Sequence, residues 1–272
     1  MSEQLSSAGR HLKELCDNAA QAVAVAIHEM VGTPEGGRTL KMGADGTPTK
    51  RIDGAAESAV LSTLRDSGMG FRVLSEEIGE VLIGEQPDHF LHLDPLDGTF
   101  NAIKGIPFYS VSIYISKGDC RFAYICDLAT GRKYYAEKGL GAYAEDRGRL
   151  SISQTNDLKD FSISGYTKRP HTGRIVALGD VVRRIRTLGS SSLEMALVAQ
   201  GSLDAFVDLR GMLRVVDVAA GKLILEEAGG MVTNAGGSEL HLDGNMWQKT
   251  ELIGSNRLKH NELLQLIGGE SH

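Results

Sequence analysis

The stretch Leu91-His92-Leu93-Asp94-Pro95-Leu96-Asp97-Gly98-Thr99 holds the densest group of chemically active residues in the chain. Its apolar first part predicts a buried strand that delivers Asp94 at its end, and Pro95 stiffens the turn that follows. Asp97 comes three residues after Asp94, where the turning chain can aim its carboxylate back, and the carbonyl of Leu96 is available to the same space. Hard cations such as Mg²⁺ prefer oxygen ligands of this kind. The stretch therefore predicts a metal site at the end of a buried strand.

The end of the stretch predicts a phosphate contact. Gly98 permits close approach of a ligand to the backbone, and the chain after it can begin a helix. Because the free N–H groups at a helix start bind phosphate, we expect Gly98 and Thr99 to contact a phosphate group. A lone Asp-x-x-Asp pair also occurs on ordinary acidic surfaces, but the buried strand, the proline and the glycine favour the metal site. His92 lies on the same strand face as Asp94 and is interpreted as a packed histidine.

Acidic residues follow two other predicted segments. Glu76 and Glu77 come directly after an apolar run at residues 71–75, again at the end of a strand. Taken alone, this pair is also typical of a solvated acidic surface. Asp217 follows the run Arg214–Val216 and opens a predicted helix, where an aspartate is a good N-cap. The same aspartate can turn one oxygen to a metal, so both interpretations of Asp217 stay open.

The residues around these motifs predict an N-terminal half that mixes helices and strands. Apolar residues repeat on one face from Leu5 to Val31, which predicts a long helix that Gly32 and Pro34 end. Gly43–Thr49 has the composition of a turn, and a second helix is expected over Asp53–Arg65. Strands are predicted at Phe71–Ser75, Phe90–Asp94, Ser110–Lys117, Arg121–Leu128 and Lys133–Glu137.

Beyond about Ser151, strands and helices alternate. Strands are predicted at Phe161–Tyr166, Arg186–Gly189, Leu203–Leu209, Met231–Thr233 and Leu252–Ser255, and helices at Ile175–Arg184, Ser191–Gln200, Val218–Ala228 and Lys259–Ile267. We therefore expect two lobes, an α+β lobe over residues 1–150 and an α/β lobe over residues 151–272. Their boundary is expected within residues 147–160.

The composition is typical of a soluble globular protein: 272 residues, 42% of them hydrophobic and 24% charged. The net charge of −6 argues against a nucleic acid or an anionic membrane as the main partner. No run is apolar over the ~20 residues that a membrane helix needs. Three irregularly spaced cysteines predict reduced thiols rather than a disulfide framework, which indicates a cytoplasmic protein.

Four separated motifs occur in order along the chain: Thr47–Asp53 (TPTKRID), Val73–Glu77 (VLSEE), Asp94–Asn101 (DPLDGTFN) and Val216–Gly221 (VDVAAG). With Gly189–Asp204 and Glu226–Gly230, they resemble the inositol monophosphatase family. The segment Asn101–Phe108 (NAIKGIPF) is most similar to its archaeal fructose-1,6-bisphosphatase/inositol monophosphatase branch. Chance agreement of four separated motifs is negligible, and the resemblance covers almost the whole chain.

The resemblance implies the fold of the sugar phosphatase superfamily, a layered αβαβα sandwich with the active site between its two lobes. It also implies a Mg²⁺-dependent phosphomonoesterase in which two or three Mg²⁺ are held by Glu76, Asp94, the Leu96 carbonyl, Asp97 and Asp217. Glu76 and Asp94 would hold the ion that activates the attacking water. Thr99 would orient that water, and Asp53 would orient the Thr99 hydroxyl.

Substrate contacts carry over less directly than the metal ligands. The family's acidic sugar-binding position falls near Asp208 or Arg210, and a bisphosphate needs basic groups for its second phosphate. The candidates are Ser191, Tyr166, Lys168, Arg169, Arg186, Asp208 and Arg210, although surface charge also explains each basic residue. We expect a small sugar or inositol phosphate as substrate, either fructose 1,6-bisphosphate or inositol monophosphate, a place in carbohydrate metabolism, and a homodimer.

Two other functions are weighed against this one. A nucleotide 3′-phosphatase of the same superfamily would share the metal chemistry and act on a compound such as adenosine 3′,5′-bisphosphate. A non-catalytic descendant that only binds a partner would be marked by a missing metal ligand, and all of the family's ligand positions are filled in this sequence.

Overall fold

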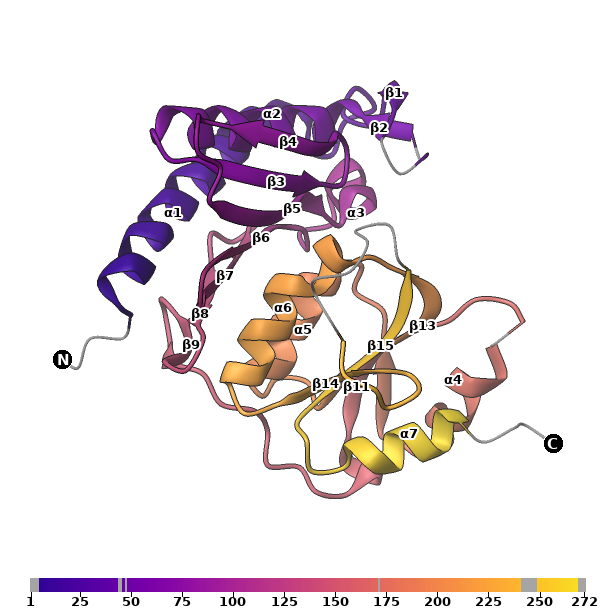
Figure 1. Ribbon diagram of the computed structural model, residues 1–272. Coiled ribbons are helices and arrows are strands. Elements are labelled where there is room, and N and C mark those ends of the chain that lie inside the picture. Colours follow the sequence, from indigo (N-terminus) through magenta and orange to yellow (C-terminus); the bar gives the residue numbers. More distant parts are fainter. Residues whose placement is uncertain (1–4, 44–45, 47, 171, 241–248, 269–272) are drawn as a thin grey trace.

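The computed structural model describes residues 5–43, 46, 48–170, 172–240 and 249–268. Its helices are α1 (Ser7–Ile27), α2 (Arg51–Asp66), α3 (Thr99–Lys104), α4 (Thr172–Gly179), α5 (Ser191–Ala199), α6 (Val215–Glu227) and α7 (His260–Gly268) (Figure 1). In the predicted turn Gly43–Thr49, residues 44, 45 and 47 lie outside the described residues. A small antiparallel pair, β1 (Thr39–Met42) and β2 (Pro48–Lys50), precedes α2.

The first large sheet is built from residues 71–149. Its strands lie in the spatial order β10 (Gly148–Arg149), β9 (Gly141–Ala144), β8 (Lys133–Glu137), β7 (Cys120–Asp127), β6 (Ser110–Lys117), β5 (His89–Asp97), β3 (Phe71–Ser75) and β4 (Gly79–Ile83). Neighbours are antiparallel except β3 and β5, which run parallel. Parallel neighbours point their carboxyl ends to one edge of a sheet, so the residues after β3 come close to the end of β5.

The second sheet is built from residues 162–255. Its order is β12 (Arg184–Arg186), β11 (Ser162–Tyr166), β13 (Ala205–Leu213), β15 (Thr250–Ser255) and β14 (Met231–Asn234). Strand β11 is parallel to both of its neighbours, whereas β15 is antiparallel to β13 and β14. Because each large sheet takes its strands from one half of the chain, we propose residues 1–150 and 151–272 as the two lobes.

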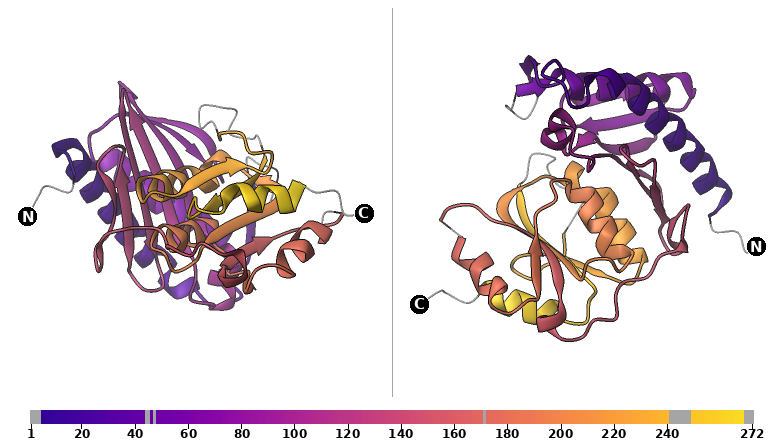
Figure 2. Two further views of the ribbon diagram at one scale, coloured as in Figure 1. Left: turned by 90° about the horizontal axis from the view of Figure 1, so that it is seen from below. Right: turned by 180° about the vertical axis from the view of Figure 1, so that it is seen from behind.

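Helices and sheets alternate in five layers (Figures 1 and 2). Helices α1 and α2 cover the outer face of the first sheet, α5 and α6 fill the space between the sheets, and α4 and α7 cover the far face of the second. Three apolar cores lie between these layers. The first, which includes Leu93, joins α1 and α2 to the first sheet, and the second, which includes Ile224, joins α5 and α6 to both sheets. The third, which includes Leu209, joins the second sheet to α4 and α7. The αβαβα sandwich implied by the resemblance is therefore confirmed.

The central helices differ from the outer ones in their apolar pattern. In α1 the buried residues form one stripe, whereas every residue of α6 from Val215 to Leu225 is buried. A helix placed between two sheets has no solvent face, which explains this composition. Helices α5 and α6 also approach each other closely, because a Cβ on Gly221 would lie 2.9 Å from the sulfur of Met195.

Strand β5 differs from the prediction in a way that shapes the site. It was expected to end at Asp94 before a turn, but it continues through Pro95 to Asp97. Its pairing with β6 is irregular there, since Asp94 lies opposite Ser112 and Asp97 opposite Ser110. Proline lacks the N–H that a regular ladder would use, so a bulge is a place where a strand tolerates it.

Other boundaries were also predicted imperfectly. Helix α1 ends at Ile27 rather than Val31, because a short 3₁₀ turn, His28–Met30, follows it. Helix α4 begins three residues before its predicted start and ends five residues before its predicted end (Thr172–Gly179 against Ile175–Arg184), and β13 extends four residues past Leu209. The short strands β1, β2, β4, β9 and β10 were not predicted, and β12 (Arg184–Arg186) overlaps the strand predicted at Arg186–Gly189 in one residue only.

Three further expectations concern membrane helices, the cysteines and His92. Among the described residues, no helix has the length and apolarity needed to cross a membrane. Cys16, Cys120 and Cys126 are free thiols, as predicted. His92 is buried, stacks on Tyr114 at 5.6 Å between ring centroids and is therefore a packed residue.

Candidate active site

A cavity of about 180 Å³ opens where the ends of β3 and β5 meet the starts of α5 and α6. Its walls include every predicted metal ligand and both residues predicted to contact phosphate, namely Glu76, Asp94, Leu96, Asp97, Asp217, Gly98 and Thr99. The remaining wall residues are Ser191, Arg210, Met212, Leu213 and Arg214. Residues from both halves of the chain thus meet at one cavity.

Three carboxylates form the centre of this cavity. One oxygen from each of Glu76, Asp94 and Asp217 lies within 4.8 Å of the others. Glu76 directly follows β3, and its N–H donates to the Leu93 carbonyl of the parallel strand β5, which carries Asp94. The third carboxylate comes from the opposite lobe.

Asp217 is the third residue of α6 and not its N-cap, which corrects one of the two interpretations drawn from the sequence. The helix begins at Val215, and Arg214 is the N-cap residue. The Arg214 N–H donates to Asp217 Oδ2 at 2.7 Å, as in a capping box. This bond holds the Asp217 carboxylate at the helix start beside the cavity.

The electrostatics of the cavity favour a bound cation. Burial, followed by repulsion from Glu76, Asp97 and Asp217, raises the pKa of Asp94 well above its ordinary value. Burial and the Asp217 charge raise the pKa of Glu76 to about 8. The Arg214 charge lowers both pKa values only in part, so buried carboxylates at this spacing still favour a further positive partner, and their oxygens are the donors that Mg²⁺ prefers. The residues present therefore fit a hard divalent cation.

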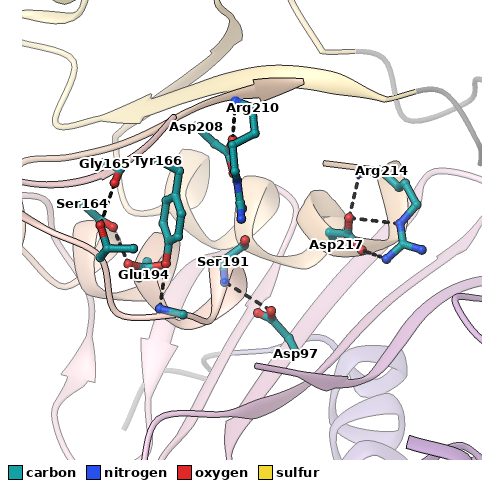
Figure 3. Close-up of polar contacts among 12 residues, drawn as sticks. Asp97, Ser164, Gly165, Tyr166, Ser191, Glu194, Asp208, Arg210, Arg214 and Asp217 are labelled. Carbon is teal, nitrogen blue, oxygen red and sulfur yellow. Dashed lines mark hydrogen bonds and ion pairs between the residues drawn. The ribbon is translucent and has the colours of Figure 1, made fainter. Parts of the chain in front are cut away.

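Asp97 lines the same cavity but, among the described residues, lies outside the group of three. Its Oδ2 accepts hydrogen bonds from the Ser190 hydroxyl at 2.7 Å and from the N–H and hydroxyl of Ser192 at 2.7 and 2.6 Å. The Ser191 N–H donates to Oδ1 at 3.3 Å (Figure 3). Asp97 therefore joins the end of β5 in one lobe to the start of α5 in the other.

Thr99 and Asp53 are joined by a hydrogen bond. The Thr99 hydroxyl donates to Asp53 Oδ1 at 2.8 Å and also lies 3.1 Å from the Leu96 carbonyl. Asp53 is the third residue of α2, and its Oδ2 accepts the Lys50 N–H at 3.1 Å. Burial raises the pKa of Asp53 to about 7, although its hydrogen bond from Thr99 lowers it. The roles of Thr99 and Asp53 in water activation stay a prediction.

Glu77, which the sequence placed only in an acidic pair, is buried behind this dyad. The Thr49 hydroxyl donates a short hydrogen bond to its carboxylate. The negative charge of Glu77 also contributes to the raised pKa of Asp53. Glu77 thus belongs to the surroundings of the predicted catalytic pair.

Among the predicted substrate residues, Ser191 and Arg210 line the cavity. The Arg210 guanidinium lies 4.3 Å from the centre of the Tyr166 ring and forms a 2.5 Å ion pair with the fully buried Asp208. Figure 3 shows Arg210 extending beside Tyr166 toward Ser191. Tyr166 and Asp208 are therefore placed to hold Arg210.

The other three basic candidates lie elsewhere. Lys168, Arg169 and Arg186 are exposed and are not among the cavity walls. The structure does not bring these three side chains together with the carboxylates.

Sequence reasoning missed two buried charged residues next to the site, Arg214 and Glu194. Glu194 accepts hydrogen bonds from the hydroxyls of Ser164 and Tyr166, the latter at 2.6 Å (Figure 3). It also accepts the Leu188 N–H at 2.9 Å. Burial raises its pKa to about 7. A glutamate among the apolar residues that follow the two serines of α5 was a signal that could have revealed this network, since a buried acid needs partners.

The comparisons with known proteins agree with the fold. A fructose-1,6-bisphosphatase/inositol-1-monophosphatase of Methanothermobacter thermautotrophicus is 40% identical over 262 residues, covering 91% of this chain and 93% of its own. A bifunctional NADP phosphatase/NAD kinase of Methanococcus maripaludis is 36% identical over 94% of this chain, which spans 49% of that larger protein.

A solved structure gives the same result. A Pyrococcus horikoshii protein described as similar to inositol-1 monophosphatase superposes with a TM-score of 0.81 at 33% identity, covering 95% of this chain and 97% of its own. The family model for inositol monophosphatases matches residues 7–270. With this match over nearly its whole length, the chain belongs to the inositol monophosphatase family.

Proposed function

We propose that this protein is a Mg²⁺-dependent phosphomonoesterase that hydrolyses fructose 1,6-bisphosphate, inositol monophosphate or both. The observation that carries the proposal is the convergence of Glu76, Asp94 and Asp217 within 4.8 Å at a cavity that Asp97 and Thr99 also line. Membership of a phosphatase family supports the same reaction.

Glu76, Asp94, the Leu96 carbonyl, Asp97 and Asp217 would hold two or three Mg²⁺. When bound, Mg²⁺ lowers the pKa of a water and stabilises the charge on the leaving oxygen. Thr99 accepts a hydrogen bond from the attacking water, because its own proton is donated to Asp53. Gly98 has a left-handed backbone with a φ of 96°, and a Cβ there would lie 3.0 Å from the Phe108 carbonyl. Glycine at this position therefore lets the chain beside Thr99 pack closely against the neighbouring backbone.

Arg210 supports a substrate with a second anionic group. It is a cavity-wall cation whose direction is fixed by Asp208 and the Tyr166 ring. A guanidinium held in place in this way is suited to binding a phosphate with two parallel hydrogen bonds. We therefore propose Arg210 as a contact for the phosphate that is not cleaved.

A nucleotide phosphate is the second candidate substrate. The match to a protein named for NADP phosphatase activity over 94% of this chain favours it. The chemistry at the scissile phosphate would be unchanged, because the proposed metal ligands contact only that group and its ester oxygen. The homodimer and the cytoplasmic location stay predictions.

Phosphate release from a panel of substrates tests the proposal. The panel contains fructose 1,6-bisphosphate, inositol 1-phosphate, NADP and adenosine 3′,5′-bisphosphate, each with Mg²⁺ and with a chelator. We expect Mg²⁺-dependent release from the sugar or inositol phosphate at a higher kcat/KM than from either nucleotide. A nucleotide preference would make the second candidate the function, and no Mg²⁺-dependent release from any substrate would contradict both.

A further inference from the structure

Arg214 contacts two of the proposed metal ligands at once. Its Nη2 lies 2.5 Å from Glu76 Oε1 and 2.9 Å from Asp217 Oδ1. The two acids come from opposite lobes, so a single guanidinium nitrogen lies between β3 and α6. The three side chains are largely buried, with exposed fractions of 10% for Arg214, 23% for Glu76 and 10% for Asp217.

Both oxygens of Asp217 accept hydrogen bonds from this one residue. Oδ2 accepts the Arg214 backbone N–H at 2.7 Å and its Nε–H at 3.2 Å, and Oδ1 accepts from Nη2 at 2.9 Å. Arginine stays protonated at every pH of interest. A divalent cation bound by Glu76 and Asp217 would lie only a few ångströms from the Arg214 guanidinium, which contacts the same carboxylates. Like charges repel strongly in a partly buried site.

We propose that Arg214 is an internal counter-ion that competes with Mg²⁺ for Glu76 and Asp217, and so sets the Mg²⁺ concentration at which the site fills. The inference rests on the proposed metal site, but it concerns the affinity for Mg²⁺ and not the reaction. If Arg214 instead helped Mg²⁺ to bind by orienting Asp217, its removal would weaken Mg²⁺ binding.

The cavity offers a matched control in Arg210. It is the same residue type and lines the same cavity, but its ion pair is with Asp208, which is not a proposed metal ligand. Arg210→Met therefore removes the same charge at the same cavity and leaves the contacts of Glu76 and Asp217 intact. It reports how much a general change of charge alters Mg²⁺ binding.

The test is a calorimetric titration of the full chain with Mg²⁺, without substrate. We expect Arg214→Met to bind Mg²⁺ about tenfold more tightly than the wild type, or more, the size expected from the loss of charge-assisted hydrogen bonds. Arg210→Met should gain clearly less. The rise in Tm on adding saturating Mg²⁺ should also be larger in Arg214→Met, because that variant lacks its counter-ion until Mg²⁺ binds.

Unchanged or weaker Mg²⁺ binding by Arg214→Met would overturn the inference, as would an equal gain in Arg210→Met. Arg214→Gln decides the matter if the Met variant does not fold, since its uncharged amide removes the positive charge but can still donate a hydrogen bond to one of the acids. Its affinity should lie above that of the wild type, and an affinity at or below the wild-type value would overturn the inference. A wild-type protein that binds no Mg²⁺ would instead contradict the metal centre itself.

Discussion

Asp53 and Asp217 occupy the same local position in different lobes. Each is the third residue of its helix and accepts the N–H of the residue that precedes that helix. One oxygen of each carboxylate is thereby fixed by local backbone geometry, and the other is directed to Thr99 in one case and to Arg214 in the other. The start of a helix thus orients two residues that the family resemblance had assigned to the active site.

The dyad of Thr99 and Asp53 should behave as one unit. In Asp53→Asn, the amide oxygen is needed by the Lys50 N–H, which leaves the amide NH₂ facing Thr99 and reverses the direction of the hydrogen bond. Each single change, Asp53→Asn or Thr99→Val, should lower kcat by on the order of 10²–10⁴. The double variant should be little slower than the slower single variant. Losses in kcat that multiply would show that the two residues act independently.

Arg210 should affect a bisphosphate and spare a monophosphate. Arg210→Gln should raise KM for fructose 1,6-bisphosphate roughly 10-fold or more, since a charge-assisted contact contributes about 1.5–3 kcal/mol. KM for inositol 1-phosphate should change little. The double variant Asp208→Asn/Arg210→Gln, which leaves no unpaired buried charge, should show the same pattern.

Lys168→Gln and Arg169→Gln are the controls for the Arg210 variant, because both side chains are exposed and do not line the cavity. They should leave both KM values nearly unchanged. An effect on the bisphosphate as large as that of Arg210→Gln would place the second phosphate outside the cavity.

At the residue scale, the sequence identified the acids and missed their charged partners. The acids stand in local motifs with turn residues around them. Arg214 contacts both acids only because the fold brings Glu76 and Asp217 together, although they lie 141 positions apart in the chain. Pairing of this kind depends on tertiary packing and leaves no local pattern.

At the scale of elements, the predicted helix and strand boundaries were wrong where packing outweighs the local conformational preference of the residues. Val215 and Val216 are β-branched and favour strands, so the helix was expected to start only at Val218. Their burial between the two sheets makes them the first turn of α6. The long, strongly patterned elements α2, β3 and β6 were predicted to within two residues at each end.

The link between α5 and β11 should give stability a specific pH dependence. Burial raises the pKa of Glu194 from its ordinary value of 4.5 to about 7, although the bonds from Ser164 and Tyr166 lower it. Below pH 4.5, both the folded and the unfolded protein keep this proton. Between the two pKa values only the unfolded chain releases it, so stability falls by about 3 kcal/mol as the pH rises through this window.

Glu194→Gln cannot titrate, so its free energy of unfolding should lack this contribution. The free energies of both proteins, measured by urea denaturation from pH 4.5 to pH 8, should therefore diverge as the pH rises, the wild type losing more. Two curves that stay parallel over this range would show that Glu194 does not carry a raised pKa.

At the scale of the whole molecule, the cavity exists because the strand ends of the first sheet meet the starts of α5 and α6. One lobe contributes Glu76, Asp94 and Asp97 from the ends of β3 and β5, and the other contributes Asp217 and the serine-rich start of α5. The order of the five layers came from the family resemblance and not from periodicity. Alternating strands and helices in the sequence indicate two α/β units but do not determine which faces pack together.

The most direct test of the central claim is the Mg²⁺ dependence of phosphate release in Asp97→Asn and Asp217→Asn. Asp204→Asn is a matched control, because Asp204 is also a buried, hydrogen-bonded aspartate, bonded to Ser153 and Ser162 away from the cavity. With folding verified by circular dichroism, the two site variants should lose activity on the order of 100-fold or more at any Mg²⁺ concentration, while the control and the wild type stay active. Full activity in either folded site variant would contradict the metal centre.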